Sequence, residues 1–136
     1  MIKPLNRQKN LLSQRATPAT RHDVGIGQDL ADTLKAHRQS CVGMAANMIG
    51  INKAIIAVSL GPIDVTMYNP RIIRRASPYQ TKEGCLVLDG QRTCRRYRKN
   101  TVSYLDEQMK KHRVDLEGMA AEIVQHEVDH LHGIMI

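Results

Sequence analysis

Tryptophan and phenylalanine are absent from this 136-residue chain, and tyrosine occurs only four times. A hydrophobic core must therefore be built from Ile, Leu, Val, Met and Ala. No apolar run approaches the ~20 residues that a membrane-spanning helix needs, and residues 1–4 do not begin a secretory signal. The length suits one domain with a real core and is too short for two, so we expect a single domain over residues 1–136.

Cysteine is also scarce, with three residues in widely spaced places, and this does not suggest a disulfide framework. Acidic residues are outnumbered, because 20 Lys and Arg face 13 Asp and Glu and give a net charge of +7. A basic surface favours polyanions; the alternative is a solvated face that keeps a small protein soluble. We expect neither membrane insertion nor specific DNA binding. Much of the positive charge is clustered in Arg71, Arg74, Arg75, Arg92, Arg95, Arg96, Arg98 and Lys99.

The strongest signal is the stretch of residues 125–130, which reads Gln-His-Glu-Val-Asp-His. On a helix, positions four apart lie on the same face, so His126 and His130 can direct ring nitrogens to one point. Such a pair binds a divalent transition metal, and Glu127 can reach a metal-bound water as general base. Gly118 and Gly133 bracket the segment and support a helix there. The alternative interpretation, a chance pattern on an ordinary helix, has less support because the helical context also fits a metal site.

Two histidines leave a catalytic metal one protein ligand short of the usual three. Downstream, the longer zinc-binding pattern would require a histidine where the chain has Ile136, and His132 points away from the metal face. The third ligand must therefore come from upstream, and Cys85 is the best candidate. A free cysteine can equally be a small buried hydrophobe, and we interpret Cys41 and Cys94 in that way.

Three ordered motifs together carry a family resemblance. Residues 41–50 (CVGMAANMIG), 83–86 (EGCL) and 125–130 (QHEVDH) resemble the motifs G-φ-G-φ-A-A-x-Q, E-G-C-L-S and Q-H-E-x-D-H of peptide deformylases. The resemblance implies a metalloamidase that removes formyl from the starting methionine of nascent peptides. It also implies one divalent metal per chain, which we expect to be Fe²⁺, with Zn²⁺, Ni²⁺ or Co²⁺ also suited to such ligands. A thiolate ligand favours a reducing compartment, so we expect a cytoplasmic protein.

The resemblance further assigns roles to particular residues. Cys85, His126 and His130 would bind the metal, Glu127 would move the proton, and the backbone N–H of Leu86 would stabilise the oxyanion. On the substrate side it implies Gly43, whose backbone would meet the peptide, and Arg96, for which one more surface charge is the alternative. A ligating histidine usually donates its second N–H to an acceptor, and the sequence leaves three candidates open: Glu83, Gln125 and Asp129.

Departures from the family pattern fall on the substrate side. Met48 stands where the family has the glutamine that donates to the oxyanion, and methionine has no donor. Cys41 replaces the first glycine of that motif, and Val87 replaces the serine. We therefore expect reduced deformylase activity, and the alternative is a non-catalytic module that contains a metal and binds peptide or the ribosome.

Hydrophobic spacing predicts the elements. After an irregular stretch over residues 1–20, the spacing of Ile26, Leu30 and Leu34 predicts a helix from about residue 23 or 27 to 39. A β-branched run predicts a buried strand over residues 53–60, paired across a Gly-Pro turn with residues 63–68.

Further along, Asn69-Pro70 should break the second strand before it resumes at residues 72–73, and residues 77–79 should form a loop. A separate hairpin is predicted to pair residues 93–97 with 101–105. Residues 113–116 add a short strand, and residues 117–131 form the motif-bearing helix. The expected fold class is α+β, with antiparallel sheets packed around a central C-terminal helix that carries the HExxH motif.

Overall fold

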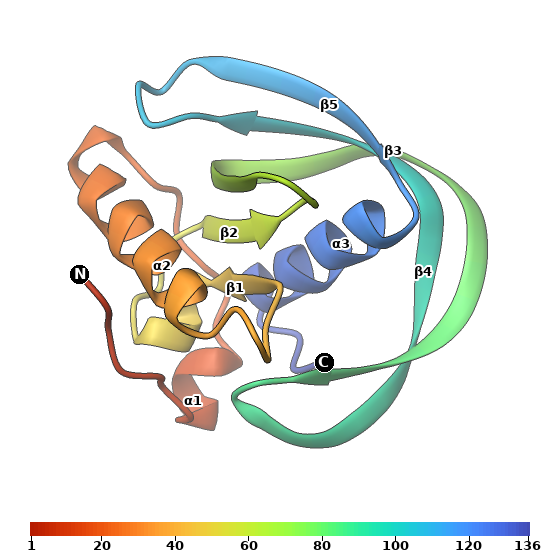
Figure 1. Cartoon of the computed structure of the whole chain (residues 1–136), viewed down its shortest axis with the longest axis horizontal. Coiled ribbons are helices and arrows are strands. Elements are labelled where there is room, and N and C mark those ends of the chain that lie inside the picture. The colour runs from red at the N-terminus through yellow and green to blue at the C-terminus, as the bar shows by residue number, and fades with distance from the viewer.

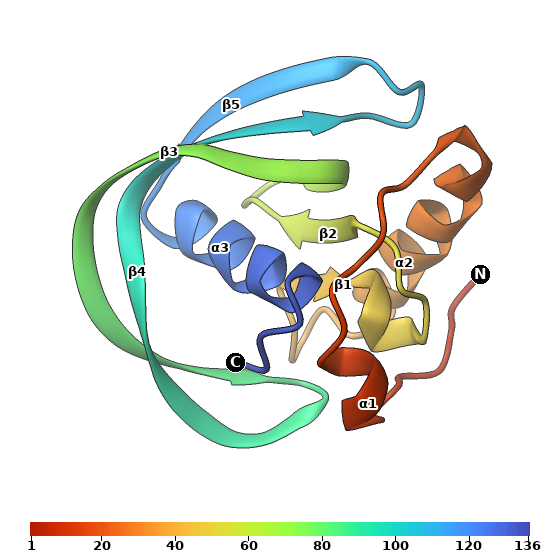
Figure 2. The same ribbon diagram turned by 180° about the vertical axis from the view of Figure 1, so that it is seen from behind.

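Helix α3 (Met119–Leu131) lies inside a strongly curved antiparallel sheet in the computed structural model, which describes residues 1–136 (Figures 1 and 2). The sheet has five strands in the order β1-β2-β3-β4-β5, and every neighbouring pair is antiparallel. The expected α+β class is confirmed. The strands are β1 (Gly43–Ala45), β2 (Ile55–Ser59), β3 (Asp64–Cys85), β4 (Leu88–Leu105) and β5 (Lys111–Glu117).

Two long strands form most of the wall around α3. β3 has 22 residues and β4 has 18, and they pair from Tyr68↔Leu105 to Cys85↔Leu88 as one bent hairpin. The predicted separate hairpin of residues 93–97 with 101–105 is therefore wrong, because both segments lie in the single strand β4. That strand pairs with β3 on one side and, from residue 99 onward, with β5 on the other.

The predicted breaks at Asn69-Pro70 and at residues 77–79 are also wrong, because β3 runs through both. β2 pairs with β3 only as far as Tyr68, so Pro70 and Pro78 lie where one edge of β3 has no partner strand and a missing N–H is tolerated. Register shifts between residues 68 and 74 and positive φ values at Asn69 and Ser77 absorb the irregular residues. The same irregularities bend the hairpin around α3.

The N-terminal part of the chain covers the face of the sheet opposite α3. A short helix, α1 (Lys9–Leu12), interrupts the stretch that was predicted to be irregular. The 3-10 turn η1 (Arg21–Asp23) then leads into α2 (Val24–Ala36), which ends before the predicted residue 39. Thr20 and Asp23 form a reciprocal capping box at this start, with Thr20 N–H donating to Asp23 Oδ2 at 2.8 Å.

Apolar side chains pack into two clusters, one on each side of the sheet. Leu30 and Leu34 of α2 belong to the cluster that also contains Met44 and Met48, whereas Val124 and Val128 of α3 belong to the other. The core uses aliphatic side chains and methionine, as the composition requires. No helix is long and apolar enough to cross a membrane.

A glycine fixes the end of α3 against the N-terminal segment. Gly133 has φ +77°, and a Cβ at this position would lie 2.4 Å from the carbonyl oxygen of Ser13. Only glycine gives both the left-handed conformation and the close approach. The start of the chain therefore packs against the end of the helix that carries the motif.

Candidate metal centre and active-site cleft

Three side chains converge where the β3–β4 turn meets α3. One ligand atom each from Cys85, His126 and His130 lies within 4.8 Å of the other two. Cys85 is the last residue of β3 and is half-buried, while both histidines are buried. The Nε2 atoms of His126 and His130 are 3.2 Å apart, so both rings point to one place, as their spacing on α3 predicts.

The two histidine rings of this cluster differ in their electrostatics. Burial lowers the pKa of His130 to about 3, which keeps its ring neutral and leaves a nitrogen lone pair available. Burial also disfavours protonated His126, but hydrogen bonds with Cys85 and Glu83 prevail and raise its pKa to about 10. The donor set of one thiolate and two imidazoles fits a divalent transition metal.

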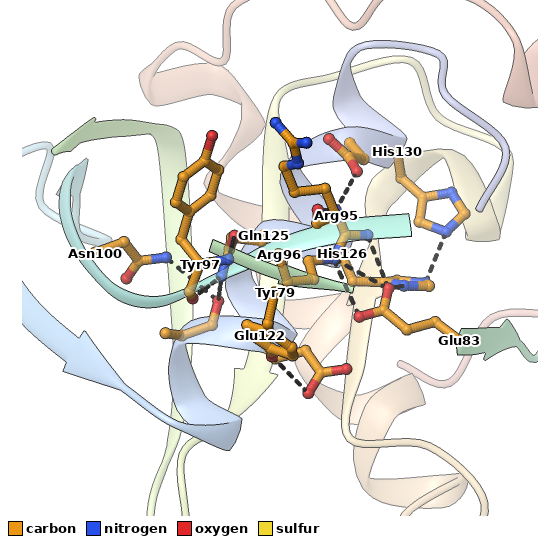
Figure 3. A network of polar contacts seen from close by, with 12 residues as sticks. Tyr79, Glu83, Arg95, Arg96, Tyr97, Asn100, Glu122, Gln125, His126 and His130 are labelled. Atoms are coloured by element: carbon orange, nitrogen blue, oxygen red, sulfur yellow. Dashed lines mark hydrogen bonds and ion pairs between the residues drawn. The ribbon is translucent and has the colours of Figure 1, made fainter. Parts of the chain in front are cut away.

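A buried ion-pair network holds His126 in this orientation (Figure 3). Nδ1–H of His126 donates to Glu83 Oε1 at 2.7 Å, which leaves Nε2 facing the centre. Arg96 donates from Nη2 to Glu83 Oε1 and from Nη1 to Asp129 Oδ2, each at 2.7 Å. Burial disfavours the Glu83 carboxylate, yet the bonds from His126 and Arg96 hold its pKa below the ordinary range.

These contacts distinguish the three residues that the sequence left open as acceptors for the second N–H of a ligating histidine. Glu83 accepts directly from the ring of His126, and Asp129 acts one step further out through Arg96. Gln125 contacts neither ring, because its side chain bonds the backbone N–H and carbonyl of Tyr97 and ties α3 to β4 (Figure 3). His130 Nδ1 is buried and has no hydrogen-bond partner in the structure.

Arg96 is not the surface charge that one interpretation of the sequence allowed. Its side chain is 5% exposed, so the surface-charge alternative is wrong. It is also absent from the residues that line the cleft, because Glu83 and Asp129 occupy its guanidinium. The cross-strand pair Tyr79↔Arg96 directs it toward α3, a register that the sequence pattern did not reveal.

A cleft of about 230 Å³ opens beside the three converging side chains. Glu127 lines it, is 4% exposed and has an Oε1 atom without a hydrogen-bond partner. Burial raises the pKa of Glu127 to about 7, which suits a group that accepts and returns a proton near neutral pH. Gly43 of β1 makes room for it, because a Cβ there would lie 2.9 Å from Glu127 Oε2.

Two backbone features of the cleft can meet a substrate. Leu86 lies in the turn between β3 and β4, and its N–H donates to no acceptor in the structure. Gly43 belongs to β1, which pairs only with β2 and is an edge strand of the sheet. Free backbone groups on an edge strand can bind an extended peptide.

Met48 lies in the wall of the cleft and is 1% exposed. Its sulfur accepts the Ala45 N–H at 3.4 Å and provides no donor. The neighbouring Asn47 does not replace the missing amide, because its Nδ2 donates to the backbone carbonyl of His130 at 3.0 Å. The sequence assigned no role to Asn47, and its only signal was an amide within the first motif, directly before Met48.

A cysteine sulfur and two imidazole rings that converge beside a buried glutamate, in a cleft bounded by an edge strand, are the arrangement of a metallohydrolase. The family model of polypeptide deformylases matches residues 3–136. The chain is 43% identical over 136 residues to a peptide deformylase of Clostridium beijerinckii, covering 100% of both chains. It belongs to the peptide deformylase family.

Solved structures show the same likeness. The fold matches the Met-Ala-Ser-bound class I type b peptide deformylase of Acinetobacter baumannii with a TM-score of 0.88 and 28% identity, covering 99% of this chain and 97% of that one. It matches the peptide deformylase of Thermotoga maritima with a TM-score of 0.88 and 26% identity, covering 99% and 95%.

Proposed function

We propose that residues 1–136 form a single catalytic domain in which Cys85, His126 and His130 hold one divalent metal ion and Glu127 is the general base. As a member of the peptide deformylase family, the chain is a hydrolase that removes the N-formyl group from newly made peptides. The single observation that carries the residue assignment is the convergence of the three ligand atoms beside the buried Glu127.

Family membership implies a divalent metal, and the donor set suits iron, zinc, nickel or cobalt. We propose Fe²⁺ in the cell. When bound, the metal acts as a Lewis acid and lowers the pKa of a water molecule towards neutrality. Glu83 keeps His126 turned toward the metal through the 2.7 Å bond.

The protein side chains then act on the proton and on the substrate. Glu127 accepts the proton from the attacking water and delivers it to the amine as the formyl C–N bond breaks, which yields formate and a free N-terminus. The free Leu86 N–H donates to the oxygen of the tetrahedral intermediate. Gly43 offers its strand edge to the extended peptide. The Acinetobacter relative bound to Met-Ala-Ser supports methionine as the first residue of the substrate.

Met48 supports a slower reaction than in relatives with an amide donor at this position. Loss of one oxyanion donor commonly costs ~10²–10³ in kcat. The same observation favours a second candidate function, a module that binds metal and peptide without turnover. We further expect a cytoplasmic protein, since its substrate is made on the ribosome, and contact with ribosomal RNA through exposed residues such as Arg95 and Lys99.

The decisive experiment measures formate release from formyl-Met-Ala-Ser by protein purified anaerobically and analysed for metal. We expect about one metal per chain and measurable turnover. In Glu127→Ala, kcat should fall by ~10²–10⁴ while metal content stays unchanged. Peptide binding without formate release by the metal-loaded protein would favour the binding module, and a folded protein without metal would contradict the metal assignment.

A further inference from the structure

The excess positive charge of the chain is concentrated in one hairpin. Residues 65–105 hold nine Lys or Arg and two Asp or Glu, so this segment accounts for the whole net charge of +7. The other residues carry eleven charges of each sign and together are neutral. The segment covers nearly all of β3 and all of β4, and Arg96 is its only cation in an ion pair. Seven of the other eight are exposed, namely Arg71, Arg74, Arg75, Lys82, Arg95, Arg98 and Lys99.

Five of these cations share the convex face of the hairpin, which points away from α3 (Figures 1 and 2). Successive residues of a strand point to opposite faces, and the buried Arg96 and Asn100 of β4 bond residues of α3. Arg95 and Lys99 of β4 therefore point outward. Directly opposite residues of an antiparallel pair share one face, and the register places three cations of β3 opposite outward residues of β4: Arg71↔Ser103, Arg74↔Thr101 and Lys82↔Thr93.

Tyr97, which also points outward, orients a further arginine. The Cζ atom of Arg75 lies 5.3 Å from the centroid of the Tyr97 ring. Stacking of this kind holds the plane of a guanidinium while its N–H groups stay free to donate to phosphate oxygens. Beside this pair, β3, β4 and β5 form a hollow of about 620 Å³, with Asp115 and Glu117 on its β5 side. These two acids border the cationic face, so an anion is favoured over β3 and β4.

A long cationic ribbon without free aromatic rings fits the backbone of a nucleic acid duplex. From Arg71 to Lys82, β3 extends about 36 Å at ~3.3 Å per residue, so it can meet several phosphates at once. Single strands are usually bound with exposed aromatic rings for base stacking, whereas Tyr97 is half-buried and covered by Arg75. A lipid surface calls for apolar side chains that insert, and Ile73 is the only large exposed hydrophobic residue of the hairpin. Double-helical RNA is recognised mainly through its shape and its backbone.

Resting on the proposed function and its expected contact with ribosomal RNA, we propose that the convex face of the β3–β4 hairpin binds the phosphate backbone of double-helical RNA without preference for base sequence. None of the cations on this face lines the cleft, so RNA binding and peptide hydrolysis use different residues. An enzyme held on RNA in this way works close to the place where its formylated substrates are made.

The test measures fluorescence anisotropy of two labelled RNA duplexes, of equal length and different sequence, with the metal-loaded protein over a range of salt concentrations. We expect equal affinities for the two duplexes. Five phosphate contacts should give a plot of log affinity against log salt with a slope of about −4 to −5. Vesicles of phosphatidylserine and a polyglutamate peptide compete as alternative polyanions. No binding to either duplex at low salt, or tighter binding to vesicles or polyglutamate, would overturn the inference.

Two triple variants assign the binding to this face. The first replaces three exposed cations of the convex face: Arg74→Gln, Arg95→Gln and Lys99→Gln. The matched control removes the same charge from exposed arginines of the N-terminal part: Arg7→Gln, Arg15→Gln and Arg21→Gln. The first variant should bind the duplexes ~10–100-fold more weakly, with the salt slope reduced by about three, while the control should keep most of the affinity.

Equal losses of affinity in the two variants would mean that overall charge alone attracts the RNA, and the assignment to this face would fail. Formate release from formyl-Met-Ala-Ser should be unchanged in both, because the six replaced residues lie outside the cleft. Failure of RNA binding with normal formate release would leave the proposed function standing. Failure of formate release by the wild-type protein with normal RNA binding would contradict the proposed function alone.

Discussion

The two walls of the cleft differ in how far they follow the family pattern. The metal wall, made of Cys85, His126, Glu127 and His130, keeps every residue that the chemistry needs. The facing wall, made of Cys41, Gly43 and Met48, keeps only the glycine. Gly43 is also the residue that the metal wall itself requires, because any side chain there would collide with Glu127.

On the proposed assignment of roles, holding the metal and stabilising the reacting oxygen are separable tasks. The metal wall depends on a helix face, one strand end and the buried Glu83–Arg96 pair. The facing wall depends on a short edge strand and the 3-10 turn η2 (Ala46–Ile49). A substitution at Met48 can therefore change turnover without changing the ligand set.

The largest effect should come from breaking the metal wall with His130→Ala. Metal content should fall from about one per chain to near zero, and formate release should fall at least ~10³-fold, because two ligands hold a catalytic metal poorly. Elemental analysis measures the metal content, and the formate assay measures turnover. His132→Ala is the matched control, since this exposed neighbour is outside the ligand cluster and should change neither. Full metal retention in His130→Ala would contradict the assignment.

Met48→Gln tests the facing wall by adding the amide donor that this wall lacks. If the oxyanion has lost one donor, the new amide should raise kcat by up to ~10²–10³, with a smaller change in KM. Steady-state kinetics on formyl-Met-Ala-Ser measure this. The buried amide can also cost about 1–3 kcal/mol if it lacks partners, so the melting temperature is recorded alongside. A stable, metal-loaded variant with an unchanged kcat would show that the wall is adapted to another role.

Glu83→Gln weakens the hydrogen bond that orients the ligand His126 and leaves all three ligands in place. The loss of charge weakens the bond to His126 and leaves Arg96 with only Asp129 as a charged partner. Metal affinity should fall by ~10–100-fold, as measured by competition with a chelator. Glu117→Gln, an exposed acid on β5, serves as the control. Equal affinities would mean that the His126 ring is fixed by packing alone.

The smallest effect should come from Asp23→Ala, which lies outside both walls. The loss of the capping box at Thr20 should cost about 1 kcal/mol of the free energy of unfolding at pH 7. Hydrogen bonding from the Thr20 backbone lowers the pKa of Asp23 from 3.8, so the carboxylate stabilises the fold above that pH. The difference should therefore shrink as the pH falls below 3.8. Denaturant unfolding at pH 7 and at a pH below 3.8 measures this difference in the free energy of unfolding. Formate release at pH 7 should be unchanged.

Local chemistry explains what could be predicted from sequence. The antiparallel α+β class and the motif-bearing helix followed from periodicity and glycine placement, because these signals are contained within a few residues. The meeting of Cys85 with the two histidines followed from the need for a third ligand and from the family resemblance. The roles assigned to these residues stay predictions until the variants are measured.

Long-range pairing explains what could not be predicted. Pro70 and Pro78 indicate breaks when read locally, yet they lie in β3 because one edge of that strand is free. Arg96 looked like a substrate-side or surface charge, since nothing near it in sequence shows that Glu83 and Asp129 enclose it. The amide of Asn47 bonds the carbonyl of His130, a residue far along the chain. In each case the deciding contact, or the lack of one, arises only in the folded chain.

The enclosure of α3 by the β3–β4 hairpin also determines the order in which the centre can assemble. Synthesis delivers Cys85 at the end of β3 well before His126 and His130 emerge on α3. The helix cannot bury its face until the whole hairpin is in place, and such distant pairings form slowly. Metal uptake during refolding should therefore be a late event, following the burial of α3, and would report completion of the fold.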